Sequence, residues 1–388
     1  MKIIHTGDWH IGKLVHGVHM TEDQRHMLKQ LVETIEIEKP QVLIIAGDIY
    51  DRSIPPVEAV ELLDDTLSEI ILKHEITVIA IAGNHDSPDR VGFASKILTD
   101  RGLHIRGNIS REIIPVKVED EYGTVDFYPV PFAEPAVVRE LYGEGEIKTH
   151  DDAMKMVLGR IVDKMDGNSR NVCISHAFLM GTEAPETSES ERPLSIGGSE
   201  YVNVDYYDPF DYVALGHLHR PQKVKNEKIR YSGSLLKYSF SEARQRKSIT
   251  IVDMDGDGNV EYELRELEPL RDLRIIKGDL NSLMDREIYS LGNTDDYIMA
   301  SLTDKGELLD PIGRLRSVYP NILRLEREQF DREAGEDRTS AGDEFSRKNP
   351  VELFGEFYEN LSGEEFDEGK KGIVVDIFDE IGRKGREV

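Results

Sequence analysis

The sequence predicts a mixed α/β protein, and three observations lead to that prediction. Short apolar runs rich in Val, Ile and Leu recur through the first two thirds of the 388-residue chain, as in Val42–Ala46 and Val78–Ala82. Amphipathic stretches with helical spacing lie between these runs, an alternation typical of α/β domains. Only 39% of the residues are hydrophobic, but they are concentrated in such runs, so we expect a packed core.

The individual strands and helices follow from the same pattern. Helices are predicted over Glu22–Glu38 and Val57–His74, and near Ala153–Asp166. Strands are predicted at Lys2–Thr6, Val42–Ala46, Val78–Ala82, Arg170–Ser175 and Tyr212–Leu215. The polar segment Gly181–Gly198 is expected to form a long surface loop, and such loops inside compact domains are usually functional or disordered.

A hairpin and a smaller α/β region are predicted further along the chain. Strands Ile249–Met254 and Val260–Glu266 flank Asp255–Asn259, a plain turn that lacks the spaced ligands and terminal Glu of a calcium loop. The smaller region is predicted from apolar runs at Leu273–Ile276, Tyr297–Leu302 and Ile322–Leu325. From Glu326 to Asn349 the chain is charged and nearly without apolar residues, which indicates a linker.

We therefore expect four parts along the chain. They are a main domain over residues 1–268, a small α/β domain over 269–330, a charged linker over 331–349 and C-terminal helices over 350–388. Apolar residues in the last part recur at helical spacing in two stretches. Two such helices after a polar linker need a surface to pack on, which is either a partner protein or the chain's own main domain.

The charge of the chain limits what it can bind by itself. The formal net charge is −27, from 48 basic and 75 acidic residues. Such a chain is repelled by anionic membranes and by nucleic acid at long range, and it cannot hold DNA by charge alone. An enzyme whose bound metal ions supply local positive charge is still allowed. If the substrate is DNA, we expect a partner to help bind it.

Cysteine content and hydropathy predict a protein of the reducing cytoplasm. The single cysteine, Cys173, allows neither an intrachain disulfide nor a cysteine-based zinc site. No apolar run approaches the ~20 residues needed to cross a bilayer, so no membrane association is expected. The N-terminus lacks the pattern of a signal peptide, because Met1–Ile4 leads straight into a polar motif at Asp8.

Polar side chains follow five of the predicted strands where each strand ends. The motifs are Gly7-Asp8-Trp9-His10, Gly47-Asp48-Ile49-Tyr50-Asp51-Arg52, Gly83-Asn84-His85-Asp86, Ser175-His176 and Gly216-His217-Leu218-His219. Any one of them is compatible with a structural role. Their repetition at strand ends, where α/β sheets gather ligands, predicts one shared site. Alternation in an extended backbone would bring Asp8 and His10 to the same side of the chain.

Carboxylate, imidazole and amide groups together suit a pair of divalent ions. Two ions about 3.5–4 Å apart can share a bridging carboxylate, clamp a phosphate and activate a water that attacks phosphorus. Histidine and carboxylate without thiolate suit Mn, Fe, Zn, Co or Ni better than Mg or Ca. We therefore expect two divalent ions per chain, with Mn²⁺ as the first candidate and the identity of the metal open.

In their order along the chain, these motifs resemble the signature of calcineurin-like metallophosphoesterases. Further motifs resemble the SbcD family of nuclease subunits, namely Asp8–Lys13, Asp51–Ser53, Ser190–Leu194 and Tyr231–Ser234. The resemblance implies a metallophosphoesterase sandwich of two mixed β-sheets flanked by helices, with a smaller α/β capping domain and C-terminal helices. It also implies an SbcC-like coiled-coil ATPase as partner, to which the C-terminal helices would dock, and a homodimer within a heterotetramer.

The same resemblance implies a role for each residue of the site. Asp8, His10 and His219 would hold one ion, Asn84, His176 and His217 the other, and Asp48 would bridge the two. His85 would stabilise or protonate the leaving oxygen, and Asp51 would orient His85 as a carboxylate orients an imidazole elsewhere. Archaeal and eukaryotic relatives have histidine at the position of Asp51, so the partner of His85 stays open.

Two basic features each keep two interpretations. Arg52 either binds phosphate beside the metals or is a solvated side chain. The densest basic stretch comprises Arg230, Lys237, Arg244, Arg246 and Lys247. It either marks a nucleic-acid surface or forms the charged edge of a hairpin.

Three functions fit the sequence. The first is a metal-dependent DNA nuclease subunit, exonuclease on duplex ends and endonuclease on single-stranded or hairpin DNA, acting with an ATPase in DNA repair and recombination. The second is a two-metal phosphatase or phosphodiesterase acting on a small molecule, which explains the second domain and the apolar tail less readily. The third is a scaffold that has lost its metals, against which the complete ligand set argues. We expect the nuclease.

Overall fold

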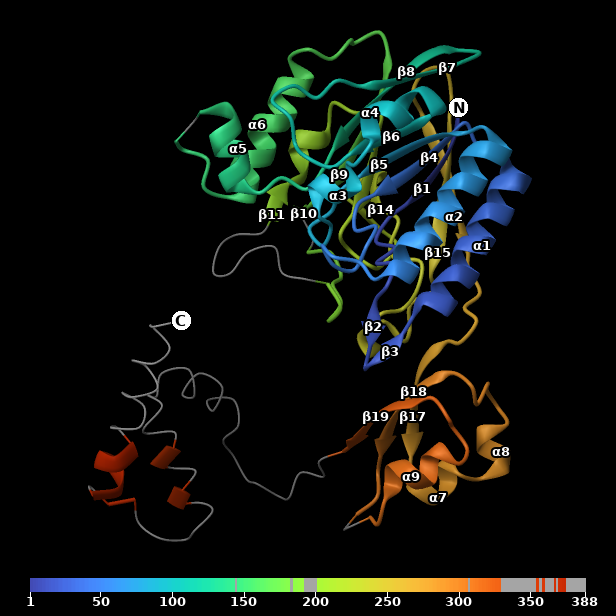
Figure 1. Cartoon of the computed structure of the whole chain (residues 1–388), viewed down its shortest axis with the longest axis vertical. Coiled ribbons are helices and arrows are strands. Elements are labelled where there is room, and N and C mark those ends of the chain that lie inside the picture. Colours follow the sequence, from blue (N-terminus) through green and yellow to red (C-terminus); the bar gives the residue numbers. More distant parts are fainter. Residues whose placement is uncertain are drawn as a thin grey trace. The chain divides into compact units, whose positions relative to one another are not determined.

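The computed structural model describes residues 1–143, 145–181, 184–191, 201–305, 308–328, 354–355, 358–359, 366–367 and 369–374. By its internal contacts the chain forms two compact units, Met1–Glu328 and Gln329–Val388. The first unit contains all of the strands described below (Figure 1). In the second, residues 354–355, 358–359 and 369–374 are helical, while the predicted linker over 331–349 and most of the predicted C-terminal helices lie outside the described residues.

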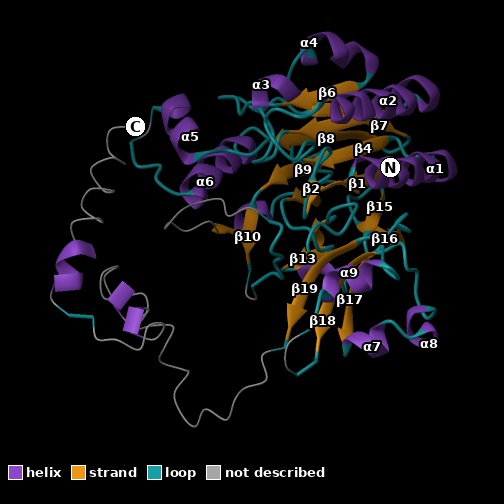
Figure 2. Cartoon of the chain, turned by 60° about the horizontal axis from the view of Figure 1, so that its bottom comes forward, coloured by secondary structure: helices purple, strands orange, loops and turns teal. Residues whose placement is uncertain are grey.

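Two mixed six-stranded sheets form the body of the first unit (Figure 2). In spatial order, the first sheet consists of β16 (Val260–Glu266), β15 (Ser248–Met254), β1 (Lys2–Thr6), β4 (Val42–Ala46), β5 (Thr77–Ile81) and β6 (Leu103–Arg106). The second consists of β13 (Gln222–Val224), β14 (Asn226–Tyr231), β12 (Tyr212–Gly216), β9 (Arg170–His176), β8 (Gly123–Val130) and β7 (Val116–Asp120). The central strands of each sheet run parallel, and antiparallel strands close the edges at β15, β16, β13 and β7.

Helices cover the outer face of each sheet, and the inner faces of the two sheets meet. The long helices α1 (Thr21–Glu38) and α2 (Val57–His74) pack on the first sheet, and α5 (Pro135–Tyr142) and α6 (His150–Val162) pack on the second. Strand β4 shows the consequence, because Leu43 faces the helices while Ile44 faces the other sheet. A strand buried on both faces reads as an uninterrupted apolar run. The predicted sandwich of two mixed sheets flanked by helices is confirmed.

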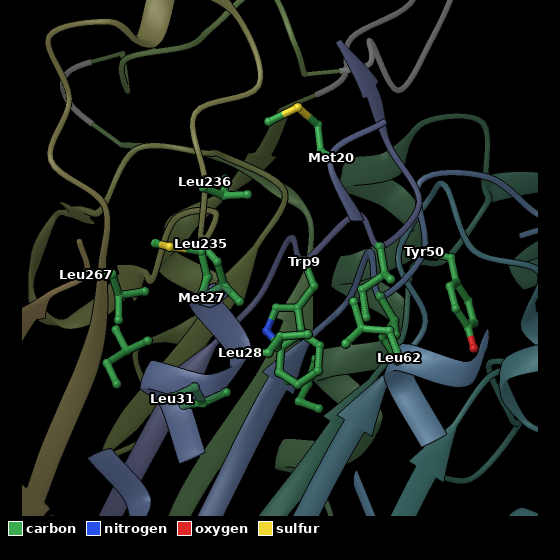
Figure 3. Close-up of a cluster of buried hydrophobic side chains, with 14 of the residues drawn as sticks. Trp9, Met20, Met27, Leu28, Leu31, Tyr50, Leu62, Leu235, Leu236 and Leu267 are labelled. Carbon is green, nitrogen blue, oxygen red and sulfur yellow. The ribbon is translucent and has the colours of Figure 1, made fainter. Parts of the chain in front are cut away.

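Trp9 anchors the first polar motif in this core. Its side chain is 1% exposed and lies among Met27, Leu28 and Leu31 of α1 (Figure 3). The indole Nε1 donates to Thr6 Oγ1 at 3.1 Å, so the polar end of the ring is also satisfied. Trp9 is therefore fixed in the hydrophobic core, whereas the side chains of its neighbours, Asp8 and His10, do not belong to this core.

The remaining elements of the main body are short. They are β2 (Leu14–Val15), β3 (Val18–His19), α3 (Pro88–Val91), α4 (Ser95–Leu98), β10 (Phe178–Met180), β11 (Tyr201–Asn203) and the 3₁₀ turns Thr99–Arg101, Val204–Tyr207 and Phe240–Glu242. Of the predicted loop Gly181–Gly198, the described residues 184–191 contain neither helix nor strand. Among the helices that the structure describes, none combines the length and the apolar character required to span a membrane.

A third sheet forms the smaller α/β region. It has three parallel strands, β17 (Leu273–Gly278), β18 (Tyr297–Leu302) and β19 (Ile322–Arg327), with α7 (Leu280–Leu283), α8 (Arg286–Tyr289) and α9 (Pro311–Arg316) between them. The buried carboxylate of Asp23 in α1 accepts hydrogen bonds from Arg271 Nη1 (2.9 Å) and Tyr297 Oη (2.8 Å). These contacts tie the small sheet to the main body, and both belong to the first compact unit.

Most predicted elements recur within one or two residues, and the exceptions have physical causes. Helix α6 begins at His150 rather than near Ala153, because Thr149 and Asp152 form a reciprocal capping box. It ends at Val162, short of the predicted Asp166. Strands β6, β7, β8, β13 and β14 were among those not predicted.

Arg170 in β9 forms a buried ion pair with Asp120, at the end of β7 in the same sheet. The closest approach is 2.5 Å, and both side chains are 6% exposed. Replacing Arg170 with Met leaves the carboxylate with the N-terminal ammonium, 3.0 Å away, as its counter-charge. We therefore expect a loss of about 3 kcal/mol in the free energy of unfolding, the lower end for a broken buried pair. Urea unfolding at pH 7, followed by the fluorescence of the buried Trp9, measures this loss.

The exposed pair Lys164–Glu112 provides the matched control, because its side chains are 67% and 61% exposed. Lys164→Met should change stability by less than about 1 kcal/mol. The hydrogen bond from Arg170 lowers the pKa of Asp120 below its ordinary value. The stabilisation is therefore complete above the ordinary pKa of Asp and declines as the pH falls from there through the lowered pKa. Equal losses for Arg170→Met and Lys164→Met would contradict the buried-pair interpretation.

Candidate metal centre

The predicted site residues come together where the carboxyl ends of parallel strands from both sheets meet. Residues after β1, β4 and β5 come from the first sheet, and residues at the ends of β9 and β12 come from the second. The side chains of this centre that are almost fully buried, between 0% and 4% exposed, are Asp8, His10, Asp48, His176, His217 and His219. Asn84 and His85 are half-buried.

Asp48 occupies the middle of the cluster. Its Oδ2 atom lies 3.7 Å from His10 Nε2 and 3.4 Å from His176 Nε2, and its other oxygen accepts from the main-chain N–H of His85 at 2.8 Å. Asp8 Oδ1 lies 3.9 Å from His176 Nδ1. The ligand-type atoms of Asp8, Asp48 and His176 all lie within 4.8 Å of one another, which is close enough for a shared cation.

The remaining ligand atoms surround this core on two sides. His219 Nε2 lies 3.0 Å from His10 Nε2. Asn84 Oδ1 lies 2.9 Å from His176 Nε2 and 3.3 Å from His217 Nδ1. The structure thus brings together all seven residues predicted as metal ligands.

The chemistry of these atoms fits a metal ion. Among the described residues, Asp8 Oδ2 and His10 Nδ1 are buried polar atoms with no hydrogen-bond partner. A buried carboxylate oxygen without a donor is costly unless a cation neutralises it. The nitrogen, carboxylate and amide donor set is that of Mn, Fe, Zn, Co or Ni rather than of calcium.

Electrostatics within the cluster point the same way. Burial raises the pKa of Asp8 to about 7. Burial alone would lower the pKa of His176, but the negative charges of Asp48 and Asp8 raise it to about 9. Burial also holds the pKa of His10 and of His217 well below the ordinary value for histidine. Because metal binding requires neutral imidazole, a divalent ion at this centre would displace the proton of His176.

The route by which Asp8 and His10 meet differs from the predicted one. Both residues have left-handed backbone conformations, with φ of 52° and 46°, and Asp48 (49°) does too. The prediction from extended-strand alternation was therefore wrong about the backbone, because the chain leaves the strand before these residues. Left-handed conformations are uncommon for residues other than glycine and tend to occur at functional sites.

Two glycines allow the loops of the two sheets to approach each other. A Cβ atom on Gly47 would lie 2.3 Å from His176 Nδ1, and one on Gly216 would lie 1.8 Å from the carbonyl oxygen of Ala46. The same carbonyl accepts from His176 Nδ1 at 2.9 Å, which turns Nε2 of that ring towards Asp48. Both motifs therefore need the glycine that precedes the predicted ligand.

His85 lies at the edge of the cluster, its ring centre 4.7 Å from that of His10. Its Nδ1 contacts the main-chain oxygen of Asp51 at 2.8 Å. The Asp51 carboxylate binds Lys13 Nζ at 2.6 Å instead. The predicted pairing of His85 with Asp51 thus takes place through the backbone, and the predicted carboxylate contact is replaced by an ion pair. Arg52, the predicted phosphate ligand, is exposed.

Sequence reasoning missed two residues that hold the loops of this centre. Gln24 in α1 donates to the carbonyl of His10 (2.7 Å) and accepts from the N–H of Gly12 (3.0 Å). Asp86 accepts from three main-chain N–H groups, those of Ile49, Tyr50 and Gly83. Asp86 belongs to the predicted motif Gly83-Asn84-His85-Asp86, but its position there provided no reason to assign it a role. Gln24 lies in a helix, and no pattern near it in the sequence indicates a contact with the site.

The basic stretch predicted around residues 230–247 does not form one surface. Arg230 is 3% exposed and stacks on Tyr262, and Lys247 is 5% exposed and pairs with Glu242. Arg244 and Arg246 are exposed. The nucleic-acid interpretation of the whole stretch is therefore wrong, because two of its cations serve internal contacts.

Comparisons with known proteins give two family matches and a similar nuclease subunit. The calcineurin-like phosphoesterase family matches residues 1–221, and the family described as type 5 capsule protein repressor C-terminal domain matches residues 269–361. The chain is 35% identical over 362 residues to the D subunit of the SbcCD nuclease from Staphylococcus epidermidis, which covers 93% of this chain and 94% of that protein.

Matches among solved structures include two at 10% sequence identity. The protein TT1561 of Thermus thermophilus matches with a TM-score of 0.36, over 68% of this chain and 98% of the other. A dimetal phosphatase from Danio rerio matches with a TM-score of 0.41, over 70% and 98%.

Gly47→Ala tests the close approach at the centre. The added methyl group must displace His176, so we expect metal affinity to fall by about 10–100-fold, as when the group that orients a metal ligand is lost. Isothermal titration with Mn²⁺ measures the affinity. Gly143→Ala is the matched control, because Gly143 also has positive φ (71°) but a Cβ there meets no atom within 4 Å. Equal metal affinity in the two variants would contradict the steric argument.

Proposed function

Since the chain belongs to the calcineurin-like phosphoesterase family, and within it to the family of the SbcD nuclease subunits, it is a phosphodiesterase, and we propose that it cleaves DNA with two divalent ions. Activity on duplex ends and on single-stranded or hairpin DNA is part of this proposal. The supporting observation is the buried cluster of ligand atoms around Asp48.

The proposal assigns the ligands to two ions. Asp8, His10 and His219 hold one, Asn84, His176 and His217 hold the other, and Asp48 bridges them. The position of Asp48 Oδ2 between His10 Nε2 and His176 Nε2 supports this division, since one ring comes from each proposed set. Two bound ions would activate a water for attack on phosphorus and neutralise the charge that develops on the phosphate. Mn²⁺ is the ion we propose first.

His85 is the proposed proton donor. Its Nδ1–H donates to the Asp51 carbonyl, so Nε2 can give a proton to the oxygen that leaves phosphorus only from the imidazolium form of the ring, in which both nitrogens carry hydrogen. Lys13 keeps the Asp51 carboxylate occupied, which leaves the ring of His85 without a direct anionic partner there. Arg52, exposed next to Asp51, is the proposed contact to a neighbouring phosphate of the substrate.

A coiled-coil ATPase is the proposed partner. The similar Staphylococcus protein is named as one subunit of a nuclease complex. A chain with net charge −27 has little capacity to attract DNA at long range, so a second subunit that contributes DNA contacts fits its electrostatics. We propose that residues 350–388 dock to this ATPase. We also propose that the resulting complex acts in DNA repair and recombination.

The nuclease proposal predicts a substrate preference. With Mn²⁺, the protein should degrade linear duplex DNA, more strongly with the ATPase present, and removal of metal with EDTA should abolish cleavage. Asp48→Asn should lower the rate on the order of 100-fold or more, because loss of the bridging charge displaces both ions. Gel assays of end-labelled DNA measure the rate.

The comparison substrate is a generic aryl phosphodiester under the same conditions. Glu189→Gln serves as the control variant, because this exposed carboxylate changes charge without touching a proposed ligand. Robust turnover of the small substrate, with no DNA cleavage in either the presence or the absence of the ATPase, would replace the nuclease proposal with a small-molecule phosphodiesterase.

Exposed apolar side chains on two segments beside the site support the proposal of a homodimer. They are Ile54, Val57 and Val60 on one segment and Phe93 and Ile97 on the other, and they are between 45% and 81% exposed. The first segment follows the Asp51–Arg52 motif and the second follows the Asn84–Asp86 motif, so both leave the metal centre from adjacent strands. Exposed apolar groups favour association with a complementary surface. We propose that these two segments pair with their copies in a second chain.

Phe93→Asp combined with Ile97→Asp should convert the dimer to a monomer, because buried like charges would face each other across a symmetric interface. Light scattering during gel filtration measures the molar mass. Leu72→Asp is the control, since Leu72 is similarly exposed at 74% but lies at the far end of α2. A wild-type protein that is monomeric at micromolar concentration would rule out this interface.

A further inference from the structure

His219 is held by four polar groups that the proposed metal chemistry does not use. Glu242 and Lys247 are buried, and Ser190 and Glu191 are half-buried. They come from the turn at residues 188–191, from the 3₁₀ turn Phe240–Glu242 and from the residue before β15, so three separate segments converge on one residue.

The contacts at the imidazole define which nitrogen carries the proton. His219 Nδ1 lies 2.7 Å from Ser190 Oγ and 3.3 Å from Glu242 Oε1, and Ser190 Oγ in turn donates to Glu242. An ionised carboxylate can only accept, so the hydroxyl hydrogen goes to Glu242 and the hydroxyl oxygen accepts from Nδ1–H. Nε2 is therefore left with its lone pair, on the side that faces His10.

The main chain of His219 is held as firmly as the ring. Its N–H donates to Glu191 Oε1 at 2.8 Å, and its carbonyl accepts from Lys247 Nζ at 2.8 Å. Glu191 is itself fixed by the N–H of Ser188 at 2.7 Å. Nδ1, the main-chain N–H and the carbonyl of His219 are thus all bound outside the metal centre, and Nε2 lies inside it, 3.0 Å from His10 Nε2.

Glu242 is kept as an anion inside the protein. Its side chain is 0% exposed and lies 2.6 Å from Lys247 Nζ, which is 4% exposed. The buried ammonium of Lys247 and the hydrogen bond donated by Ser190 Oγ both stabilise the negative charge of this carboxylate. Burying such a pair adds little stability and often costs some. Since stability does not account for this buried ion pair, its contact with His219 indicates a role in holding that residue.

The other half of the centre lacks this arrangement. His176 Nδ1 is bound by the neutral carbonyl of Ala46 at 2.9 Å, and the carboxylate of Asp8, itself a proposed metal ligand, stays 3.9 Å from that nitrogen. A carboxylate behind a metal-binding imidazole makes the ring a stronger ligand than a neutral acceptor does. The two proposed ion sites therefore differ in one respect: a carboxylate, Glu242, lies behind His219, whereas a neutral carbonyl lies behind His176.

We propose that Ser190, Glu191 and Glu242 are positioning residues that fix the orientation and tautomer of His219 and make its ion site the tighter of the two. The inference rests on the proposed function, because it uses the assignment of His219 with Asp8 and His10 to one ion. Ser190 and Glu191 set the geometry, and Glu242 supplies the negative charge.

Titration of metal-free protein with Mn²⁺, with free ion followed by electron paramagnetic resonance, tests the inference without relying on activity. Wild type should bind two ions with different affinities. Ser190→Ala and Glu242→Gln should weaken the tighter site by about 10–100-fold, as is typical when a group behind a metal ligand is lost, and should leave the other within about twofold. Ser190→Thr keeps the hydroxyl and should restore the wild-type affinity.

Two further measurements separate positioning from folding. Glu189→Gln removes an exposed carboxylate that lies within the same turn but forms no hydrogen bond or ion pair with His219 in the part of the chain that the structure describes, and this variant should bind both ions like wild type. The histidine ¹⁵N spectrum should show proton loss from Nδ1 of His219 in Ser190→Ala but not in Ser190→Thr. This measurement tests the inference without the Glu242→Gln variant, should that variant fail to fold.

The outcomes are distinct. Wild type that binds fewer than two ions would overturn the proposed function and this inference with it. Two ions in wild type, with unchanged affinities in Ser190→Ala and Glu242→Gln, would overturn the inference alone. Equal weakening of both sites would also overturn it, because the residues would then support the whole centre rather than His219.

Discussion

The burial of two carboxylates at one point, Asp8 and Asp48, is the constraint on which the rest of the structure depends. They are 0% and 2% exposed, and an isolated buried carboxylate costs several kcal/mol. The protein offsets the cost with main-chain N–H groups, from His217 to Asp8 and from His85 to Asp48, and with the imidazole of His176 nearby. These donors belong to different strands, so the two sheets must hold one relative position for the offsets to work.

Part of the positive charge of the molecule is also buried. The chain has a net charge of −27, yet several of its cations lie inside the fold rather than on a surface that could meet DNA. Arg170 pairs with Asp120, Lys247 pairs with Glu242, and Arg230 stacks on an aromatic ring. Under the proposed function, positive charge for a polyanionic substrate would then come from ions at the centre and from another subunit.

The long elements of the fold could be predicted from the sequence because their patterns are local. Strand β4 and helix α2 have the predicted bounds, since a run buried on both faces and a long amphipathic stretch each carry a strong signal. Edge strands such as β7 and β13 were missed. They are short and partly exposed, so each contains only one or two apolar residues, and it is pairing with β8 and β14 that makes them strands.

The sequence by itself determined which side chains form the centre, because each follows a recognisable strand and the ends of parallel strands converge. Only the tertiary structure decided how they are held. Asp51 meets His85 through its carbonyl rather than its carboxylate, and Asp8 meets His10 through left-handed turns. Gln24 and Glu242 lie 14 and 23 residues along the chain from the histidines they orient. Local patterns record burial and turns, whereas such hydrogen bonds depend on how separate segments assemble.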